Sequence, residues 1–127
     1  MAVMMQTFYW DAPKLEKKEG EWWNFIAEKV EDLGRAGFNA LWLPPVSKAS
    51  DHTSVGYDPY DYFDLGDFDQ KGGVKTLYGN RAELEALIER GTSEPHAINR
   101  IVNGTPMVRV DIFSGPRGPF VNVTVLD

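Results

Sequence analysis

Two groups of residues in this sequence carry side chains that could do chemistry. Arg109 and Asp111 are separated by one residue within an apolar run, Val108 to Ile112. A guanidinium at that position would favour the ionised form of the carboxyl group by charge pairing. Further upstream, Asp58, Asp61 and Asp64 recur at intervals of three residues. Ionised carboxylates can act as nucleophiles, metal ligands or hydrogen-bond acceptors, so the surrounding elements decide which role applies.

The three upstream aspartates raise the question of a metal-binding loop. A calcium-binding hand needs alternating oxygen ligands and a terminal glutamate, and this segment has neither. Asp58, Asp61 and Asp64 are therefore expected to form turns and to accept hydrogen bonds from the loop backbone. Because the chain has no cysteine, disulfides, zinc–thiolate sites and cysteine nucleophiles are excluded.

The first part of the chain predicts an alternation of strands and helices. Residues 3–9 are apolar and β-prone and predict a buried strand, which a charged loop over 12–20 follows. Residues 21–35 carry an apolar stripe at helical spacing, with Gly37 as the C-cap. Residues 38–43 form an apolar run that two prolines end, which predicts a strand buried on both faces and hence parallel.

A long segment over residues 46–80 is rich in Asp, Tyr and Gly and predicts little regular structure. Loops of this length are usually functional or disordered, and the aromatic residues argue against disorder. Asn80 and Glu83 predict a capping box at the start of a helix that ends at Gly91. The order of elements predicts two βα units with right-handed crossovers and a parallel sheet.

The sequence changes character after Gly91. Residues 92–104 are polar and are expected to be irregular. Residues 106–113 and 119–126 alternate between apolar and polar side chains, and turn-forming residues 114–118 lie between them. This pattern predicts a β-hairpin in which each strand has one solvated face.

Composition limits the classes of partner. The chain is 43% hydrophobic and 25% charged, with a net charge of −6. No nucleic acid partner is expected, because such binding rests on clustered Lys and Arg. No run of eighteen apolar residues exists, so no membrane partner is expected either. Residues 1–10 lack the features of a signal peptide, so the localisation, secreted or cytoplasmic, stays open.

Four ordered blocks of the sequence resemble one enzyme family. The blocks are Met5–Asp11, Gly37–Pro45, Val55–Gly66, and Gln70–Gly72 with Tyr78 and Gly79. They resemble the first strand, the second strand and the following loop in the catalytic barrel of α-amylases of glycoside hydrolase family thirteen. The resemblance covers about residues 1–90. It implies the start of a (β/α)₈ barrel and a glycosidase that acts on α-1,4-glucans such as starch.

The resemblance also implies sugar-binding residues at the ends of the strands. Sites of these barrels lie at the C-terminal strand ends, and sugars need an aromatic ring beside hydrogen-bonding groups. Tyr57 matches the family tyrosine that stacks on the sugar next to the cleaved bond, and Gln6, Trp10 and Asp61 are weaker candidates. The alternative for Tyr57 is an aromatic ring that closes over the core. Core or loop packing is the preferred interpretation of four other aromatic residues: Trp10, Trp42, Tyr60 and Tyr62.

Retaining glycosidases need two carboxyl groups, roughly 5–5.5 Å apart. The nucleophile strand of the family carries an Arg two residues before its catalytic Asp, as Arg109 and Asp111 do. Two other interpretations stay open. Residues 108–112 could be the third barrel strand, with a structural Asp111, or they could belong to an unrelated hairpin. The acid glutamate of the family has no counterpart, since Glu94 does not resemble it.

The third barrel strand of the family normally ends in an Asn-His pair, and this Asn helps to bind calcium. His52 and His96 do not lie in such a pair. Calcium is therefore the one cofactor that the resemblance implies, with its usual ligand motif missing.

These inferences give an α/β fold: a partial (β/α) barrel of two βα units with parallel strands and an added C-terminal β-hairpin. Residues 1–91 form the amylase-like part, and residues 92–127 a β-rich tail that packs on the same domain. Open sheet edges predict a homodimer or a higher assembly. The expected function is that of an α-amylase-related glycoside hydrolase with an α-glucan partner. A catalytically inactive glucan-binding or purely structural fragment is the alternative, because one candidate carboxylate is not two.

Overall fold

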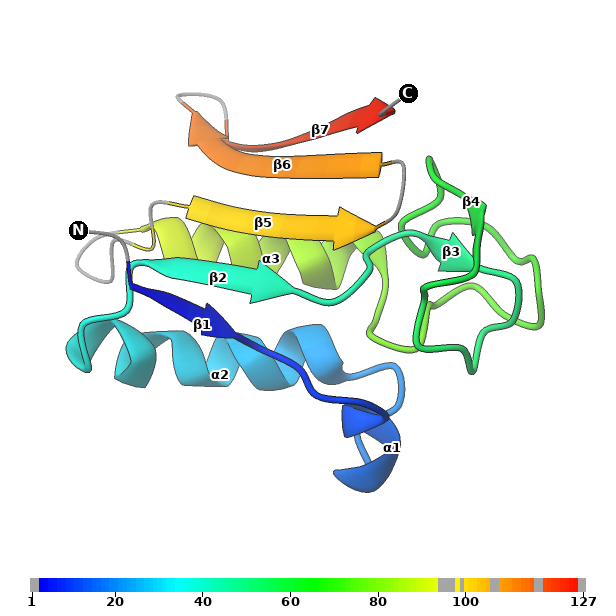
Figure 1. Ribbon diagram of the computed structural model, residues 1–127, viewed down its shortest axis with the longest axis horizontal. Coiled ribbons are helices and arrows are strands. Elements are labelled where there is room, and N and C mark those ends of the chain that lie inside the picture. Colours follow the sequence, from blue (N-terminus) through cyan, green and yellow to red (C-terminus); the bar gives the residue numbers. More distant parts are fainter. Residues whose placement is uncertain (1–2, 94–97, 99, 106–107, 116–117, 126–127) are drawn as a thin grey trace.

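A mixed five-stranded sheet organises the chain (Figure 1). A computed structural model describes the backbone of residues 3–93, 98, 100–105, 108–115 and 118–125, and the side chains of 3–93, 98 and 101. The strand order is β1 (Met4–Gln6), β2 (Ala40–Leu43), β5 (Arg100–Thr105), β6 (Val108–Gly115) and β7 (Gly118–Val125). The first three strands are parallel, and β5, β6 and β7 are antiparallel neighbours. The chain is therefore α/β, with an antiparallel hairpin added to a parallel sheet.

Two helices connect the successive parallel strands and lie together on one face of the sheet (Figure 1). Helix α2 (Trp22–Arg35) joins β1 to β2, and α3 (Arg81–Thr92) lies between β2 and β5. Leu41 and Leu43 of β2 are fully buried, whereas Trp42 between them is 38% exposed. Because alternate residues of a strand face opposite sides, the leucines belong to the helix-covered face. The core consists of these leucines and apolar side chains of both helices: Trp23, Ile26, Val30, Leu84, Leu87 and Ile88.

Local signals at the ends of the helices are confirmed. The Phe38 N–H donates to Leu33 O at 3.0 Å and the Gly37 N–H to Gly34 O at 3.1 Å, which is a Schellman motif around Gly37 at φ 101°. Helix α3 begins at the predicted capping box of Asn80 and Glu83. Both helices therefore start and stop close to the predicted residues.

Four expectations for local structure are wrong. Strand β2 is not buried on both faces, because Trp42 is exposed. Strand β1 is short and lies at a sheet edge, so Met4 is 43% exposed rather than buried. The charged loop after it contains a short helix, α1 (Ala12–Leu15), for which Pro13 supplies a preset φ in the first turn. Within the segment expected to be irregular, β5 forms because β2 offers a parallel partner, with Leu41 opposite Ile101.

The C-terminal hairpin is confirmed, with different bounds. Strands β6 and β7 pair antiparallel, and Gly115 pairs with Gly118, so the strands extend into the predicted five-residue loop. The parallel neighbour of β2 is β5, and β6 runs antiparallel to β5. The interpretation of residues 108–112 as a third parallel barrel strand is therefore wrong.

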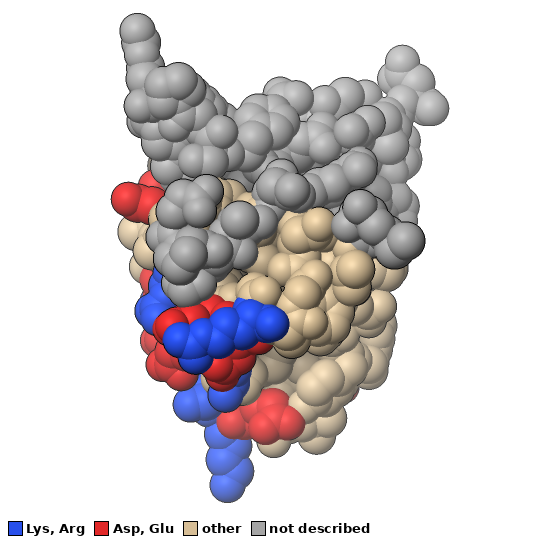
Figure 2. All heavy atoms as spheres, turned by 90° about the vertical axis from the view of Figure 1, so that its left-hand side faces the viewer, with Lys and Arg blue, Asp and Glu red and all other residues tan. Residues whose placement is uncertain are grey.

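The segment of residues 44–80, the β2–α3 loop, lies beyond the carboxyl ends of the parallel strands (Figure 1). Its regular structure within the described residues is a small antiparallel pair, β3 (Lys48–Ala49) and β4 (Pro59–Asp61). No described helix is long and apolar enough to cross a membrane. Figure 2 shows acidic and basic side chains side by side on one face of the molecule, so the described part of that face carries both signs of charge.

Candidate functional site

An aromatic pair lies where β1 and the β2–α3 loop meet. The rings of Trp10 and Tyr57 are within 11° of parallel, with centroids 6.4 Å apart. Trp10 is 69% exposed and Tyr57 is 37% exposed. Desolvation raises the pKa of the Tyr57 hydroxyl, so this group stays a neutral hydrogen-bond donor at ordinary pH. Accessible ring faces beside a hydroxyl are what the CH faces and polar rim of a sugar require.

Trp10, Trp42 and Tyr60 are not core residues, but the ring of each contacts another side chain, as the alternative of loop packing predicts. Besides Trp10, Trp42 is 38% exposed and Tyr60 is 54% exposed. The Trp42 ring meets Phe8 edge-on at 5.7 Å, and Lys71 Nζ lies 4.1 Å from the centre of the Tyr60 ring. For Tyr62 the interpretation is confirmed, because its side chain is partly buried against the core.

Gln6 is the last residue of β1 and is paired in register with Trp42. Its side chain is exposed, and its Nε2 donates to the backbone oxygen of Phe8 at 3.0 Å. The Thr7 hydroxyl donates to Trp42 O at 2.9 Å, and the Trp22 indole N–H donates to Thr7 O at 3.0 Å. The end of β1 is therefore anchored to both β2 and α2, which fixes the chain that leads to Trp10.

Asp61 uses both carboxylate oxygens within its own loop. Oδ1 accepts the Phe63 N–H at 3.0 Å, and Oδ2 accepts the Gln70 side-chain amide at 3.1 Å. Asp58 likewise accepts the hydroxyls of Ser50 and Ser54. These aspartates were expected to accept hydrogen bonds from the loop backbone. The expectation is confirmed for Asp61, which accepts the Phe63 N–H, while the partners of Asp58 are mainly serine hydroxyls.

Asp64 accepts more hydrogen bonds than either of its neighbours in the series. Oδ1 accepts the N–H groups of Gly66 at 2.9 Å and Asp67 at 2.7 Å, and Oδ2 accepts Gln70 Nε2 at 2.6 Å. Desolvation acts to raise the pKa of this fully buried carboxyl group. The N–H donors of Asp67, Gln70 and Gly66 and the charge of Lys48 outweigh that effect and lower the pKa.

Sequence reasoning missed Lys48, the fully buried partner of Asp64. Its Nζ lies 3.7 Å from Asp64 Oδ2 and donates to three backbone carbonyl oxygens of the β2–α3 loop. A lysine is almost never fully buried without partners. The sequence signal was weak: Lys48 follows Pro45, Val46 and Ser47 without any periodic pattern that would mark burial.

Arg109 and Asp111 lie in β6, and their side chains are outside the described residues. The register places Gln6, Trp42, Val102 and Asp111 in one row across four strands. Directly paired residues share a face of a sheet, so Asp111 is on the face of Gln6 and Trp42. Three strand spacings separate Gln6 from Asp111, which is about 14 Å.

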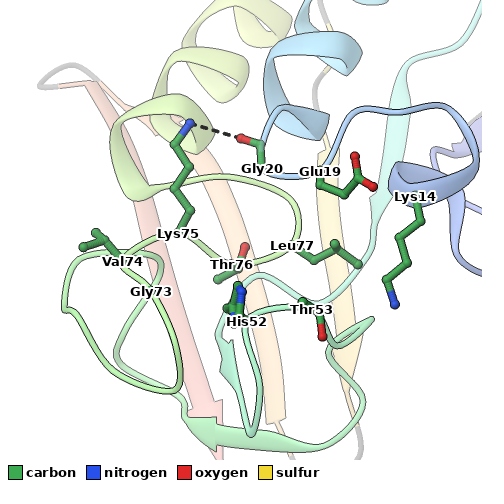
Figure 3. A pocket seen from close by; sticks show the side chains of 10 residues that line it. All are labelled: Lys14, Glu19, Gly20, His52, Thr53, Gly73, Val74, Lys75, Thr76 and Leu77. Carbon is green, nitrogen blue, oxygen red and sulfur yellow. Dashed lines mark hydrogen bonds between the residues drawn. The ribbon is translucent and has the colours of Figure 1, made fainter.

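A cavity among the described residues lies elsewhere. It has a volume of about 520 Å³ and lies between the connection from α1 to α2 and the β2–α3 loop (Figure 3). Lys14, Glu19, His52, Thr53, Lys75 and Leu77 are among its lining residues, and none of the predicted sugar-binding residues belongs to it. Lys75 pairs with Glu21 and Glu83, each at 3.0 Å, so its charge is already balanced. We favour the exposed aromatic pair over this cavity, because no Trp, Tyr or Phe side chain lines the cavity.

No group of three or more potential metal-ligating His, Cys, Asp or Glu side chains occurs in the part of the chain whose side chains are described. The residues present in that part do not form a calcium site, because the carboxylates of Asp61 and Asp64 are taken up by loop donors.

Comparison with known proteins identifies similar sequences, while no family model matches the chain. The cytoplasmic alpha-amylase of Escherichia coli is 46% identical over 88 residues, which cover 68% of this chain and 17% of that protein. The alpha-amylase of Geobacillus stearothermophilus is 44% identical over 86 residues, 67% of this chain and 15% of that protein. The glucan 1,4-alpha-maltohexaosidase of Bacillus sp. strain 707 is 41% identical over 86 residues, 68% of this chain and 16% of that protein.

These similarities confirm the resemblance to α-amylases over about two thirds of the chain. The chain spans about one sixth of the length of the curated relatives that it matches.

Proposed function

We propose, from the similarity of this segment to alpha-amylases, that the chain binds α-1,4-glucans as part of an amylase-type glycoside hydrolase. The observation that carries the proposal is the exposed pair of Trp10 and Tyr57 beyond the carboxyl ends of the parallel strands. Parallel βα arrangements place their ligands at those ends. Tyr57 supplies the stacking platform and Trp10 the neighbouring ring, with the Gln6 amide as a further hydrogen-bonding group.

The fold supports the same proposal. Strands β1, β2 and β5 with helices α2 and α3 have the order of a (β/α) barrel's first units, and we propose that they form such a partial barrel. The tail of residues 92–127 would then belong to the same domain, since β5 is hydrogen-bonded to β2. Ile98 and Ile101 of this tail are fully buried in the core.

A titration with maltohexaose followed by tryptophan fluorescence tests the proposal. Binding is expected to change the fluorescence of Trp10, and Trp10→Phe should remove this signal. Tyr57→Ala is expected to weaken binding by at least about fivefold, by analogy with the roughly 1–3 kcal/mol that a base stacked on an aromatic side chain contributes. Tyr60→Ala is the matched control, because Tyr60 is an exposed tyrosine of the same loop. Equal affinities of the Tyr57→Ala variant and the unaltered chain would refute the assignment of the platform.

Binding without hydrolysis is the second candidate, which one observation favours. Asp61 and Asp64, two of the five aspartates in the loop segment after Tyr57, have both carboxylate oxygens engaged by loop donors. Neither is therefore free to attack a glycosidic carbon. Release of reducing ends from starch, compared between the unaltered chain and Asp111→Asn, separates the two candidates. Hydrolysis that depends on Asp111 supports its role as the nucleophile beside Arg109, and the absence of hydrolysis supports binding alone.

A further inference from the structure

The interior of the β2–α3 loop contains one ammonium group. Lys48 is 0% exposed, and its Nζ donates to Phe68 O at 3.0 Å, Gly73 O at 2.7 Å and Val74 O at 2.5 Å. An ammonium group has three donors, so all of them are used. The Asp64 carboxylate, also 0% exposed, lies 3.7 Å away and balances the charge.

The Lys48 ammonium has the surroundings of a bound cation. Three backbone carbonyls and one carboxylate are the oxygen ligands that hard cations take from protein loops. The carbonyls come from residues 20 to 26 positions downstream of Lys48, in a part of the loop with little regular structure. The single ammonium therefore joins β3 to residues 68–74. Burial of the ammonium group is costly without these oxygen partners. Loss of either the charge or the partners is therefore expected to destabilise this part of the loop.

A continuous set of hydrogen bonds leads from this centre to a predicted sugar-binding residue. Gln70 Nε2 donates to Asp64 Oδ2 at 2.6 Å and to Asp61 Oδ2 at 3.1 Å. Lys48 and Asp61 are also register partners in the pair of β3 and β4. The Lys48 N–H donates to Asp64 O at 2.7 Å, which fixes the same residues through the backbone.

We propose that Lys48 is a positioning residue whose ammonium acts as a built-in cation, ordering residues 61–74 of the loop and thereby fixing Asp61, a predicted sugar-binding residue four positions after Tyr57. The ordering of the loop follows from the contacts of Lys48 alone, whereas the effect on glucan rests on the proposed function. The two parts have separate measurements.

Amide hydrogen exchange at Gly66 and Asp67 measures the order of the loop, because both N–H groups donate to Asp64. In Lys48→Met, which keeps an unbranched side chain as far as Cε and removes the ammonium, protection of these amides is expected to fall by at least about tenfold. Amides in the middle of α3 report global unfolding in the same experiment. Lys71→Met is the matched control, since Lys71 is an exposed lysine of the same loop, and it should leave the protection unchanged.

Chemical rescue distinguishes a role of the Lys48 charge from a role of its side-chain packing. Lys48→Ala removes three carbons and the ammonium, so n-propylammonium added to this variant should restore the protection of Gly66 and Asp67. Uncharged 1-propanol, of nearly the same shape, and tetramethylammonium, which has no donor, should not restore it. If either variant unfolds globally, the same three solutes are added during refolding of Lys48→Ala, and refolding with n-propylammonium alone supports the proposal. Protection within twofold of the unaltered chain in Lys48→Met, rescue by 1-propanol, or no rescue by n-propylammonium overturns it.

Maltohexaose titration of the folded Lys48→Met variant tests the part that concerns glucan. A loss of affinity of at least about fivefold is expected, with Lys71→Met unchanged. An unaltered chain that binds no glucan refutes the proposed function and leaves the loop result standing. An unaltered chain that binds, together with an equal affinity of Lys48→Met, overturns the positioning role.

Discussion

Asn80 and Glu83 hydrogen-bond each other's backbone at the first turn of α3. The Glu83 N–H donates to Asn80 Oδ1 at 2.8 Å, and the Asn80 N–H donates to Glu83 Oε1 at 2.9 Å. Asn80→Ala is expected to lower the free energy of unfolding by about 1 kcal/mol, because one of these caps is lost. Urea unfolding measures the change. Asn80→Asp retains a good N-cap and should stay close to the unaltered chain, and an equal loss in both variants would contradict the capping account.

Gly66 is required for a close approach of two backbone segments. A Cβ atom at this position would lie 2.6 Å from the Asn80 Cα and 2.7 Å from Gly79 O, at φ +97°. Gly66→Ala is therefore expected to cost more than the roughly 1–2 kcal/mol of a left-handed conformation alone. Gly37→Ala is the matched control, because Gly37 has φ +101° with nothing within 4 Å of the added atom. Equal shifts in thermal midpoint for the two variants would show that the contact with Asn80 adds no cost.

Local signals predicted more of this fold than non-local ones did. The helices and the turn at Gly37 follow from spacing and caps within a few residues, and these predictions are confirmed. Strand β5 was missed because residues 92–104 are polar, whereas the pairing of β5 with β2 involves residues about 60 positions earlier. The burial of β1 was overestimated, since an apolar run does not reveal that a strand lies at an edge.

The residues of the candidate site show the same contrast between features that the sequence predicts and features that it does not. Resemblance to a family singled out Tyr57 and Trp10, and the structure stacks the two rings at an exposed position. Lys48 could not be predicted, because its carbonyl partners lie in an irregular segment whose path no local pattern specifies. Burial of an ammonium group is costly, but this cost indicates a structural role for the lysine only when the partners of the ammonium are known.

The lowered pKa of Asp64 predicts a loss of stability in acid. A carboxyl group whose pKa is lower in the folded than in the unfolded state stabilises the fold above the unfolded value of about 3.9. This contribution is lost as the pH falls below that value and through the folded pKa. Urea midpoints measured between pH 2 and pH 7 should therefore fall at the acid end, and Asp64→Asn should flatten this fall.

The control for the acid effect is Asp69→Asn, an exposed aspartate of the same loop. This variant should retain the pH dependence of the unaltered chain. The carboxyl groups of Glu21 and Asp58 also have lowered pKa values and contribute to the fall, so Asp64→Asn reduces it without removing it. An unchanged profile in Asp64→Asn would contradict the role of this carboxylate.

Ile101 links the C-terminal strands to the core. It is 1% exposed and lies opposite Leu41 of β2. Ile101→Ala is expected to lower the free energy of unfolding by about 2–5 kcal/mol, since a buried side chain of this size leaves a cavity. Leu15→Ala, at a side chain that is 67% exposed, should change it by less than about 0.5 kcal/mol. A small effect at Ile101 in chemical unfolding would mean that residues 92–127 are not part of the cooperative unit.

The edge of the sheet at β1 predicts self-association. Within the described residues β1 pairs with β2 on one side, and Val3 and Met4 beside that edge are 42% and 43% exposed. A strand with one open edge and exposed apolar side chains invites a second copy to add a strand, so a homodimer or larger assembly is expected in light scattering after size exclusion. Met4→Lys should shift the mass towards the monomer, because a charge at an edge strand opposes pairing.

Leu15→Lys places the same charge on an exposed apolar residue of α1 and should leave the mass unchanged. A monomeric mass of the unaltered chain at high concentration would refute the prediction, because high concentration favours pairing of an open strand edge most strongly.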